Sequence, residues 1–297
     1  MSLPRQVLPG TIYLVTRRCT QRQFLLRPSA ITTAVFGYLL AVAAGRYGVA
    51  VHAFCVLSNH YHLIVSDPDA RLPAFQQFLD AFVARALNTA LGRCESFWAP
   101  DTYSAVALTS LEDVVDKTAY VLANPVAAGL VAAGSAWPGL WSSPESIGGA
   151  PLEFGRPSGF FSPDGSMPDR ATLQLVAPGR FTSADQFRAL LGPALAVREQ
   201  RARAARSCRG GFLGVARVLR QKTTASPAGR EPRRKLNPRI AARDKWKRIE
   251  ALGRLVEFLV RYQRAWDARR EGDVDAVFPA GTYLLRVLHR VPCASAA

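Results

Sequence analysis

The stretch FCVLSNHYHLIVSD, residues 54–67, holds two runs of apolar and β-branched residues separated by a Ser-Asn pair. Such a pair favours a tight turn, so the stretch predicts a β-hairpin whose second strand begins at His60. Side chains two apart on a strand share a face, so His60 and His62 project side by side while Tyr61 points the other way. Two imidazoles on one face can bind a metal ion, although a core histidine beside a surface histidine would give the same pattern.

The spacing of apolar residues predicts further elements on both sides of this hairpin. We expect helices over residues 29–47, 72–91 and 109–125, and strands over residues 11–18, 48–57, 60–67 and 103–108. Ser110 is an N-cap candidate, and Asp113 completes a capping-box pattern with it. The order strand, helix, strand, strand, helix, strand, helix predicts an α+β fold of the ferredoxin-like type, with an antiparallel sheet and helices on one face.

The composition changes after residue 147. The next stretch is dense in Gly, Pro and Ser, which predicts a linker, and helical patterns then return at 183–206, 212–221 and 239–270. We therefore expect a first domain over residues 1–147, a linker over 148–180 and a mostly helical, basic extension over 181–297.

The 297 residues carry a formal net charge of +16. Between Arg198 and Arg248, 17 basic residues stand against three acidic ones, so this part alone carries +14. Concentrated positive charge predicts a polyanionic partner, most simply nucleic acid, with a membrane surface as the alternative. The candidate DNA contacts are Arg17 and Arg18 at the end of the first strand, and Arg233, Arg234, Lys235, Lys245, Lys247 and Arg248. Solvated surface charge or a disordered basic tail would explain the same residues.

The five cysteines form no C-x-x-C pair, which argues against a zinc ribbon and a secreted disulfide framework. No apolar leader follows Met1, and the apolar run over residues 30–45 is shorter than a membrane span requires. We therefore expect a cytoplasmic, nucleoid-associated protein that does not bind a membrane.

Tyr120 and Asn124 are four residues apart on the helix that precedes Pro125, so they share one face. If this helix packs across the histidine face, Asn124 can offer an oxygen ligand and Tyr120 lies close to the metal. A core aromatic residue and a helix C-cap are the structural alternatives. Lys117 would lie beside Tyr120 and assist its ionisation, or it is a solvated surface residue.

NHYHLIV, followed about sixty residues later by YVLANPVAAGLV and then by WP, resembles the single-tyrosine HUH transposases. It is most similar to the REP-associated tyrosine transposases, which act at palindromic repeats in bacterial genomes, and the resemblance covers roughly residues 1–145. It implies that His60 and His62 bind Mg²⁺ or Mn²⁺ and that Asn124 completes the metal site. It also implies a nucleophilic Tyr120, a single-stranded or palindromic hairpin DNA substrate, and a homodimer.

The expected activity is that of a metal-dependent transposase-like endonuclease and strand transferase. Tyr120 would attack a DNA phosphate, giving a 5′-phosphotyrosine intermediate and a free 3′-OH. Two alternatives stay open: a DNA-binding protein that keeps the fold without turnover, and a metallohydrolase in which Tyr120 takes no part.

Overall fold

A central five-stranded sheet organises the molecule in a computed structural model that describes residues 4–100, 103–162, 164–207, 210–229 and 238–295. The strand order is β2-β3-β1-β4-β7, antiparallel except for the parallel pair β4 and β7. The α+β class is confirmed, and the first four strands have the antiparallel pairing of the predicted split βαβ arrangement. The strands are β1 (Thr11–Arg18), β2 (Ala50–Leu57), β3 (His60–Asp67), β4 (Ser104–Leu108) and β7 (Ile240–Ala241).

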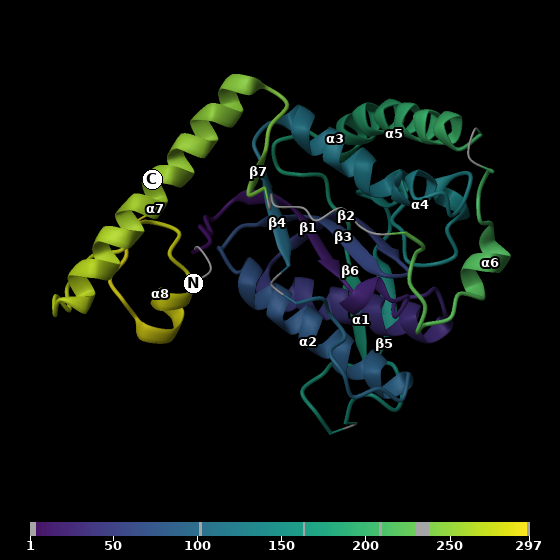
Figure 1. The fold of residues 1–297 in the computed structure, drawn as a ribbon, viewed down its shortest axis with the longest axis horizontal. Helices are drawn as coiled ribbons and strands as arrows, with labels where there is room; N and C mark the ends of the chain where they lie inside the picture. Colours follow the sequence, from purple (N-terminus) through teal and green to yellow (C-terminus); the bar gives the residue numbers. More distant parts are fainter. Residues whose placement is uncertain (1–3, 101–102, 163, 208–209, 230–237, 296–297) are drawn as a thin grey trace.

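Helices cover both faces of this sheet (Figure 1). On one face lie α1 (Ala30–Tyr47) and α2 (Leu72–Ala90), and on the other lie α3 (Leu111–Leu122) and α5 (Ala184–Ser207). The expectation of helices on one face only is therefore wrong. The reason is that β2 and β3 are buried on both sides along almost their whole length, and a sheet that is apolar on both faces needs two covering layers.

The first helix begins and ends where local sequence predicts. The Ser29 side chain accepts a hydrogen bond from the Thr32 backbone N–H at 3.1 Å, and Gly48 ends the helix with a φ of 65°. In the described part of the chain, α1 is the one helix that is long and apolar enough to cross a membrane. Half of it is buried against the sheet and α2, and this packing accounts for its apolar character.

The third helix starts with the predicted capping box, in which Ser110 and Asp113 each accept a hydrogen bond from the other's backbone N–H, both at 3.1 Å. Helix α3 ends earlier than predicted, at Leu122, and a short helix, α4 (Asn124–Ala127), follows it. The reason is Pro125, which has no N–H with which to continue α3 but is tolerated in the first turn of α4.

The Gly/Pro-rich stretch of residues 148–180 contains an antiparallel pair, β5 (Leu152–Gly155) and β6 (Arg170–Leu173). Leu173 and Leu175 are buried in the core that also holds α1. The predicted linker thus packs against the first domain, and the domain division itself stays a prediction.

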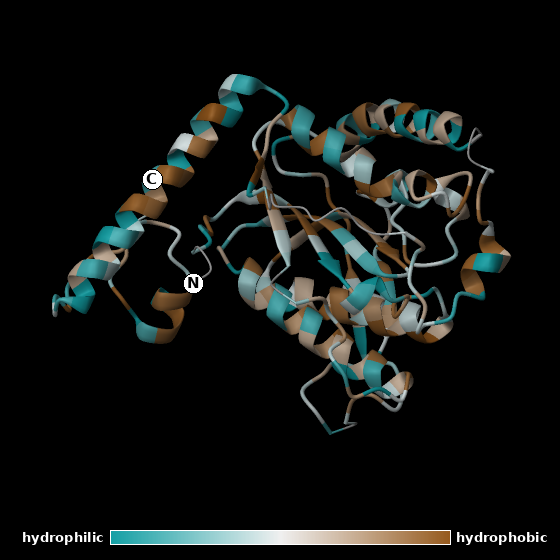
Figure 2. Cartoon of the chain, in the orientation of Figure 1, coloured by the Kyte–Doolittle hydropathy of each residue, from teal (hydrophilic) through white to brown (hydrophobic). Residues whose placement is uncertain are grey.

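The C-terminal part is mostly helical, with α6 (Val215–Leu219), α7 (Lys245–Arg270) and α8 (Leu284–His289). The predicted start of the long helix at residue 239 is wrong, because Ile240 and Ala241 pair with β4 and Asp244 caps the helix. Figure 2 shows hydrophobic and hydrophilic residues alternating along α7, which lies away from α5 and α6.

Candidate active site

The register of the sheet places the two histidines beside the end of the first strand. Thr16 pairs with His62 and Arg18 with His60, whereas Arg17 pairs with Tyr61. Since neighbours in register share a face, His60, His62, Thr16 and Arg18 project toward α3. The predicted hairpin is confirmed, with His60 as the first residue of β3.

The two imidazole rings lie next to each other, with 4.8 Å between their centroids. The Nδ1 atom of His62 is 2.7 Å from Thr16 Oγ1, and the Nδ1 atom of His60 is 2.7 Å from Asn59 Oδ1. Hydrogen bonds at Nδ1 fix the orientation of each ring. An Nδ1 that donates, as that of His60 does to the Asn59 amide oxygen, leaves the lone pair on Nε2, and the Thr16 hydroxyl can accept from His62 in the same way. This arrangement is the one that a metal ion requires of two histidine ligands.

The Nε2 atom of His62 is buried and has no hydrogen-bond partner among the described residues. Burial, and next the neighbouring His60, hold the pKa of His62 well below its usual value, so its imidazole is neutral at physiological pH. A buried acceptor without a partner costs stability, and a bound metal ion would satisfy it. The residues present therefore fit a divalent ion.

The two histidines have no third His, Cys, Asp or Glu beside them among the described residues. No cluster of three or more His, Cys, Asp or Glu side chains able to hold a metal occurs in the part of the chain that the structure describes. Asn124, the residue expected to complete the site, begins α4 and is 8% exposed. It follows Tyr120 across the break between α3 and α4, and its role as a ligand stays a prediction.

Helix α3 crosses the face of the sheet that carries the histidines. Val121 and Leu122 pack in one core with Cys55 and Leu57 of β2, and Trp141 Nε1 donates to the Leu122 carbonyl at 2.9 Å. This packing brings the Tyr120 ring to 5.5 Å from the His62 ring, centroid to centroid.

The surroundings of Tyr120 are cationic. Its side chain is 37% exposed, and the Arg198 guanidinium lies 5.9 Å from the ring centroid. The Asp116 carboxylate forms ion pairs with both neighbours: its Oδ1 lies 2.5 Å from Arg198 Nη2 and its Oδ2 lies 3.4 Å from Lys117 Nζ. Lys117, considered from sequence as an aid to tyrosine ionisation, is thus engaged by an acidic neighbour.

The site opens into a cavity of about 920 Å³. His60, His62 and Tyr120 line it, and none of the lining residues that the structure describes is acidic. Four arginines complete its charged lining: Arg18, Arg22, Arg217 and Arg220. A pocket with cationic walls and no carboxylate suits an anionic ligand such as a phosphodiester.

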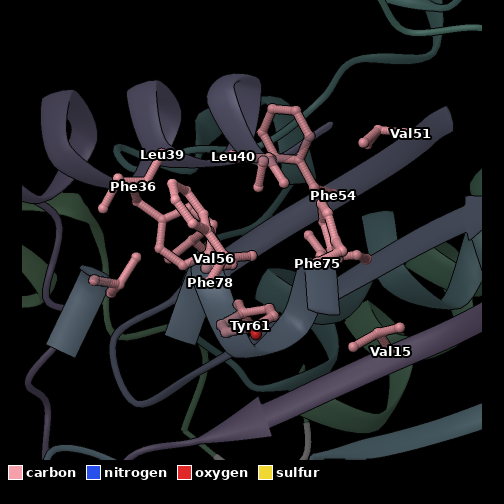
Figure 3. Close-up of a cluster of buried hydrophobic side chains, with 14 of the residues drawn as sticks. Val15, Phe36, Leu39, Leu40, Val51, Phe54, Val56, Tyr61, Phe75 and Phe78 are labelled. Carbon is pink, nitrogen blue, oxygen red and sulfur yellow. The ribbon is translucent and has the colours of Figure 1, made fainter. Parts of the chain in front are cut away.

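Tyr61 lies on the far side of the strand, as predicted, within the hydrophobic cluster between the sheet and α1 and α2 (Figure 3). Its hydroxyl donates to Asp80 Oδ1 at 2.6 Å and accepts from the Gln76 amide. Arg17 is on the same side, with its Nε 3.5 Å from Asp80 Oδ2. Burial raises the pKa of Asp80 to about 6.

The predicted DNA contacts fall in different places. Arg18 lines the cavity, whereas Arg17 lies on the opposite face of the sheet. Lys245, Lys247 and Arg248 are exposed in the first turn of α7, outside the cavity lining. Arg233, Arg234 and Lys235 lie outside the described residues.

Sequence reasoning missed Arg217 and Arg220, which reach the cavity from α6, about a hundred residues after Tyr120. The sequence marks these two arginines only as part of a basic stretch. The contacts that bring α6 to the site join segments far apart in the chain, and a single sequence does not reveal such contacts.

No protein-family model matches the chain, and no curated protein matches it in sequence. Among solved structures, a REP-associated tyrosine transposase bound to a REP hairpin is similar, with 20% identity and a TM-score of 0.39. That likeness covers 46% of this chain and 80% of the other. A proposed transposase from Deinococcus radiodurans R1 is similar over 41% of this chain and 95% of its own, with 18% identity and a TM-score of 0.30.

Proposed function

We propose that this protein is a metal-dependent tyrosine endonuclease and strand transferase that acts on single-stranded or hairpin DNA. The observation that supports this most directly is the tyrosine–histidine arrangement. Tyr120 lies beside His62, whose buried Nε2 has no partner among the described residues, in a cavity lined by arginines.

In the proposed reaction, the Tyr120 hydroxyl oxygen attacks the scissile phosphorus and loses its proton to solvent. The bond from phosphorus to the 3′-oxygen breaks, and that oxygen takes up a proton and leaves as a 3′-OH. The 5′ end stays bound as a phosphotyrosine, which conserves the phosphodiester linkage. Attack by another 3′-OH then joins two strands and releases Tyr120.

His60, His62 and Asn124 would hold Mg²⁺ or Mn²⁺, which supplies Lewis-acid polarisation of the scissile phosphate when bound. Imidazole ligands favour Mn²⁺, whereas Mg²⁺ prefers oxygen. The Arg198 guanidinium on the Tyr120 ring restricts the orientation of the nucleophile by a cation–π contact.

The test is a covalent capture experiment. A hairpin DNA labelled at its 3′ end is incubated with the full chain and Mn²⁺ or Mg²⁺, and the products are separated on a denaturing gel. We expect a labelled protein adduct that is lost in Tyr120→Phe and kept in Tyr262→Phe, a matched change on α7. Cleavage that Tyr120→Phe leaves intact would instead indicate a metallohydrolase, and binding without cleavage would indicate a DNA-binding protein.

A further inference from the structure

One wall of the cavity comes from a segment outside the part of the chain that resembles a transposase. We call residues 213–229 the strap. The cavity that the histidines and Tyr120 line is also lined by four strap residues and by residues 226–228; the four are Leu213, Arg217, Arg220 and Gln221.

Hydrogen bonds fix the strap where it enters the site. Leu213 N–H donates to the Gly129 carbonyl and Gly214 N–H to the Leu130 carbonyl, both at 2.9 Å. Val218, on α6, is fully buried in the core beneath α3. The start of the strap is therefore part of the folded domain.

Further hydrogen bonds fix the strap where it leaves the site. The Ser58 hydroxyl donates to Gln221 Oε1 at 2.6 Å, beside the β2–β3 turn. The Phe24 N–H donates to the Ala225 carbonyl at 2.9 Å. The strap thus runs from α4, past the histidine hairpin, to the loop after β1.

The strap supplies uncommitted positive charge. Arg217 lies on α6 and Arg220, three residues later, is the C-cap of that helix; both are exposed and both line the cavity. Neither makes an ion pair or hydrogen bond with a described residue, and the described residues that line the cavity include no acidic side chain. Guanidinium groups so placed bind phosphate oxygens.

The same cavity has an aromatic surface. Phe24 lines it, is half-buried and stacks on no other described aromatic ring. Exposed aromatic faces beside cationic grooves are what single-stranded nucleic acids use for base stacking. A cavity of about 920 Å³ has room for a few nucleotides of one strand.

We propose that the strap makes the catalytic face a pocket for single-stranded DNA, in which Arg217 and Arg220 bind phosphates next to the scissile one and Phe24 stacks on a base. This inference rests on the proposed function, because it takes the strand cut by Tyr120 as the ligand. It gives the chain a preference for unpaired DNA from a segment that the family resemblance does not cover.

Binding of fluorescein-labelled oligo-dT of about 12 nucleotides to the Tyr120→Phe protein, with Mn²⁺ present, tests the proposal without turnover. We expect Arg217→Gln and Arg220→Gln each to weaken binding roughly tenfold and to lower the slope of log affinity against log salt by about 0.7. Phe24→Leu should weaken binding similarly and Phe24→Tyr should restore it, because the ring and not its volume is required. Arg264→Gln, an exposed arginine on α7, should leave binding within about twofold of the parent.

Unchanged binding in both strap arginine variants, or an equal loss in Arg264→Gln, would overturn the proposal. An equal loss of affinity for the matching dA·dT duplex in the strap arginine variants would overturn the preference for single strands. The covalent adduct is measured separately in the chain with Tyr120 intact. An adduct with strap-independent binding refutes only the pocket, whereas strap-dependent binding without an adduct refutes only the proposed chemistry.

Discussion

Two buried histidines of this sheet differ in one property that decides what each can do. His52 is hydrogen-bonded at both ring nitrogens, to the Val176 carbonyl at 2.7 Å and to Ser66 Oγ at 2.6 Å. His62 is bonded at Nδ1 only, and its buried Nε2 has no partner among the described residues. The first is a satisfied structural group, whereas the second keeps a lone pair for a ligand.

The fully bonded histidine predicts an acid sensitivity of the fold. Burial lowers the pKa of His52 to about 4, so the folded state resists a proton that the unfolded chain binds near its usual pKa of 6.5. Stability is therefore present above the unfolded pKa and is lost as pH falls from about 6.5 toward 4, by about 2 kcal/mol near pH 5. His52→Gln should remove this loss, as measured by urea unfolding near pH 7 and near pH 5. If the variant loses as much stability as the parent between pH 7 and pH 5, His52 is not the group responsible for the loss.

The histidine that keeps its lone pair predicts a role for its neighbour. Thr16 orients His62 through Nδ1, and the loss of such outer-shell bonds typically weakens metal binding about 10- to 100-fold. We expect that loss for Thr16→Val in calorimetric titration with Mn²⁺. Thr172→Val, at an exposed position of β6, is the control, and equal affinities in both variants would refute the role.

At the scale of elements, what sequence could predict follows from the range of the interactions. The hairpin, α1 and the start of α3 depend on local signals, namely turn residues, apolar period and caps, and all three are where those signals place them. The second helical layer and the strap depend on contacts between segments from about sixty to about two hundred residues apart, for which one sequence holds no local signal. Hence His60, His62 and Tyr120 could be proposed from sequence as one site, but Arg217 and Arg220 could not.

The capping box at the start of the tyrosine helix predicts a measurable contribution to stability. Ser110→Ala leaves the Asp113 N–H without its partner and should lower the free energy of unfolding by about 1 kcal/mol. Ser158→Ala, an exposed serine between β5 and β6, should change it by less than about 0.5 kcal/mol. Urea unfolding of the two variants makes the comparison. Equal stability would mean that the box contributes nothing to α3.

For the whole molecule, the net charge of +16 predicts DNA binding in more than one mode. Lys245 and Lys247 flank Trp246, whose side chain is 73% exposed, at a distance from the arginine-lined cavity. Replacing both lysines by glutamine should weaken binding to duplex DNA and reduce its salt slope by roughly one to two, while leaving oligo-dT binding unchanged. The double change of Arg264 and Arg270 to glutamine controls for net charge. Loss of oligo-dT binding in the lysine variant, or an equal duplex loss in the control, would show that the two modes are not separate.

A segment near the start of the described chain pairs with one near its end. Val7 N–H donates to the Gly281 carbonyl at 3.0 Å, and Gln6 bridges to Thr282. During synthesis, strands β1, β2 and β3 can pair long before Gln6 and Val7 do, because the partners of these two residues lie more than 270 positions later in the chain. Among the backbone amides of the N-terminal region, that of Val7 should gain protection from hydrogen exchange last.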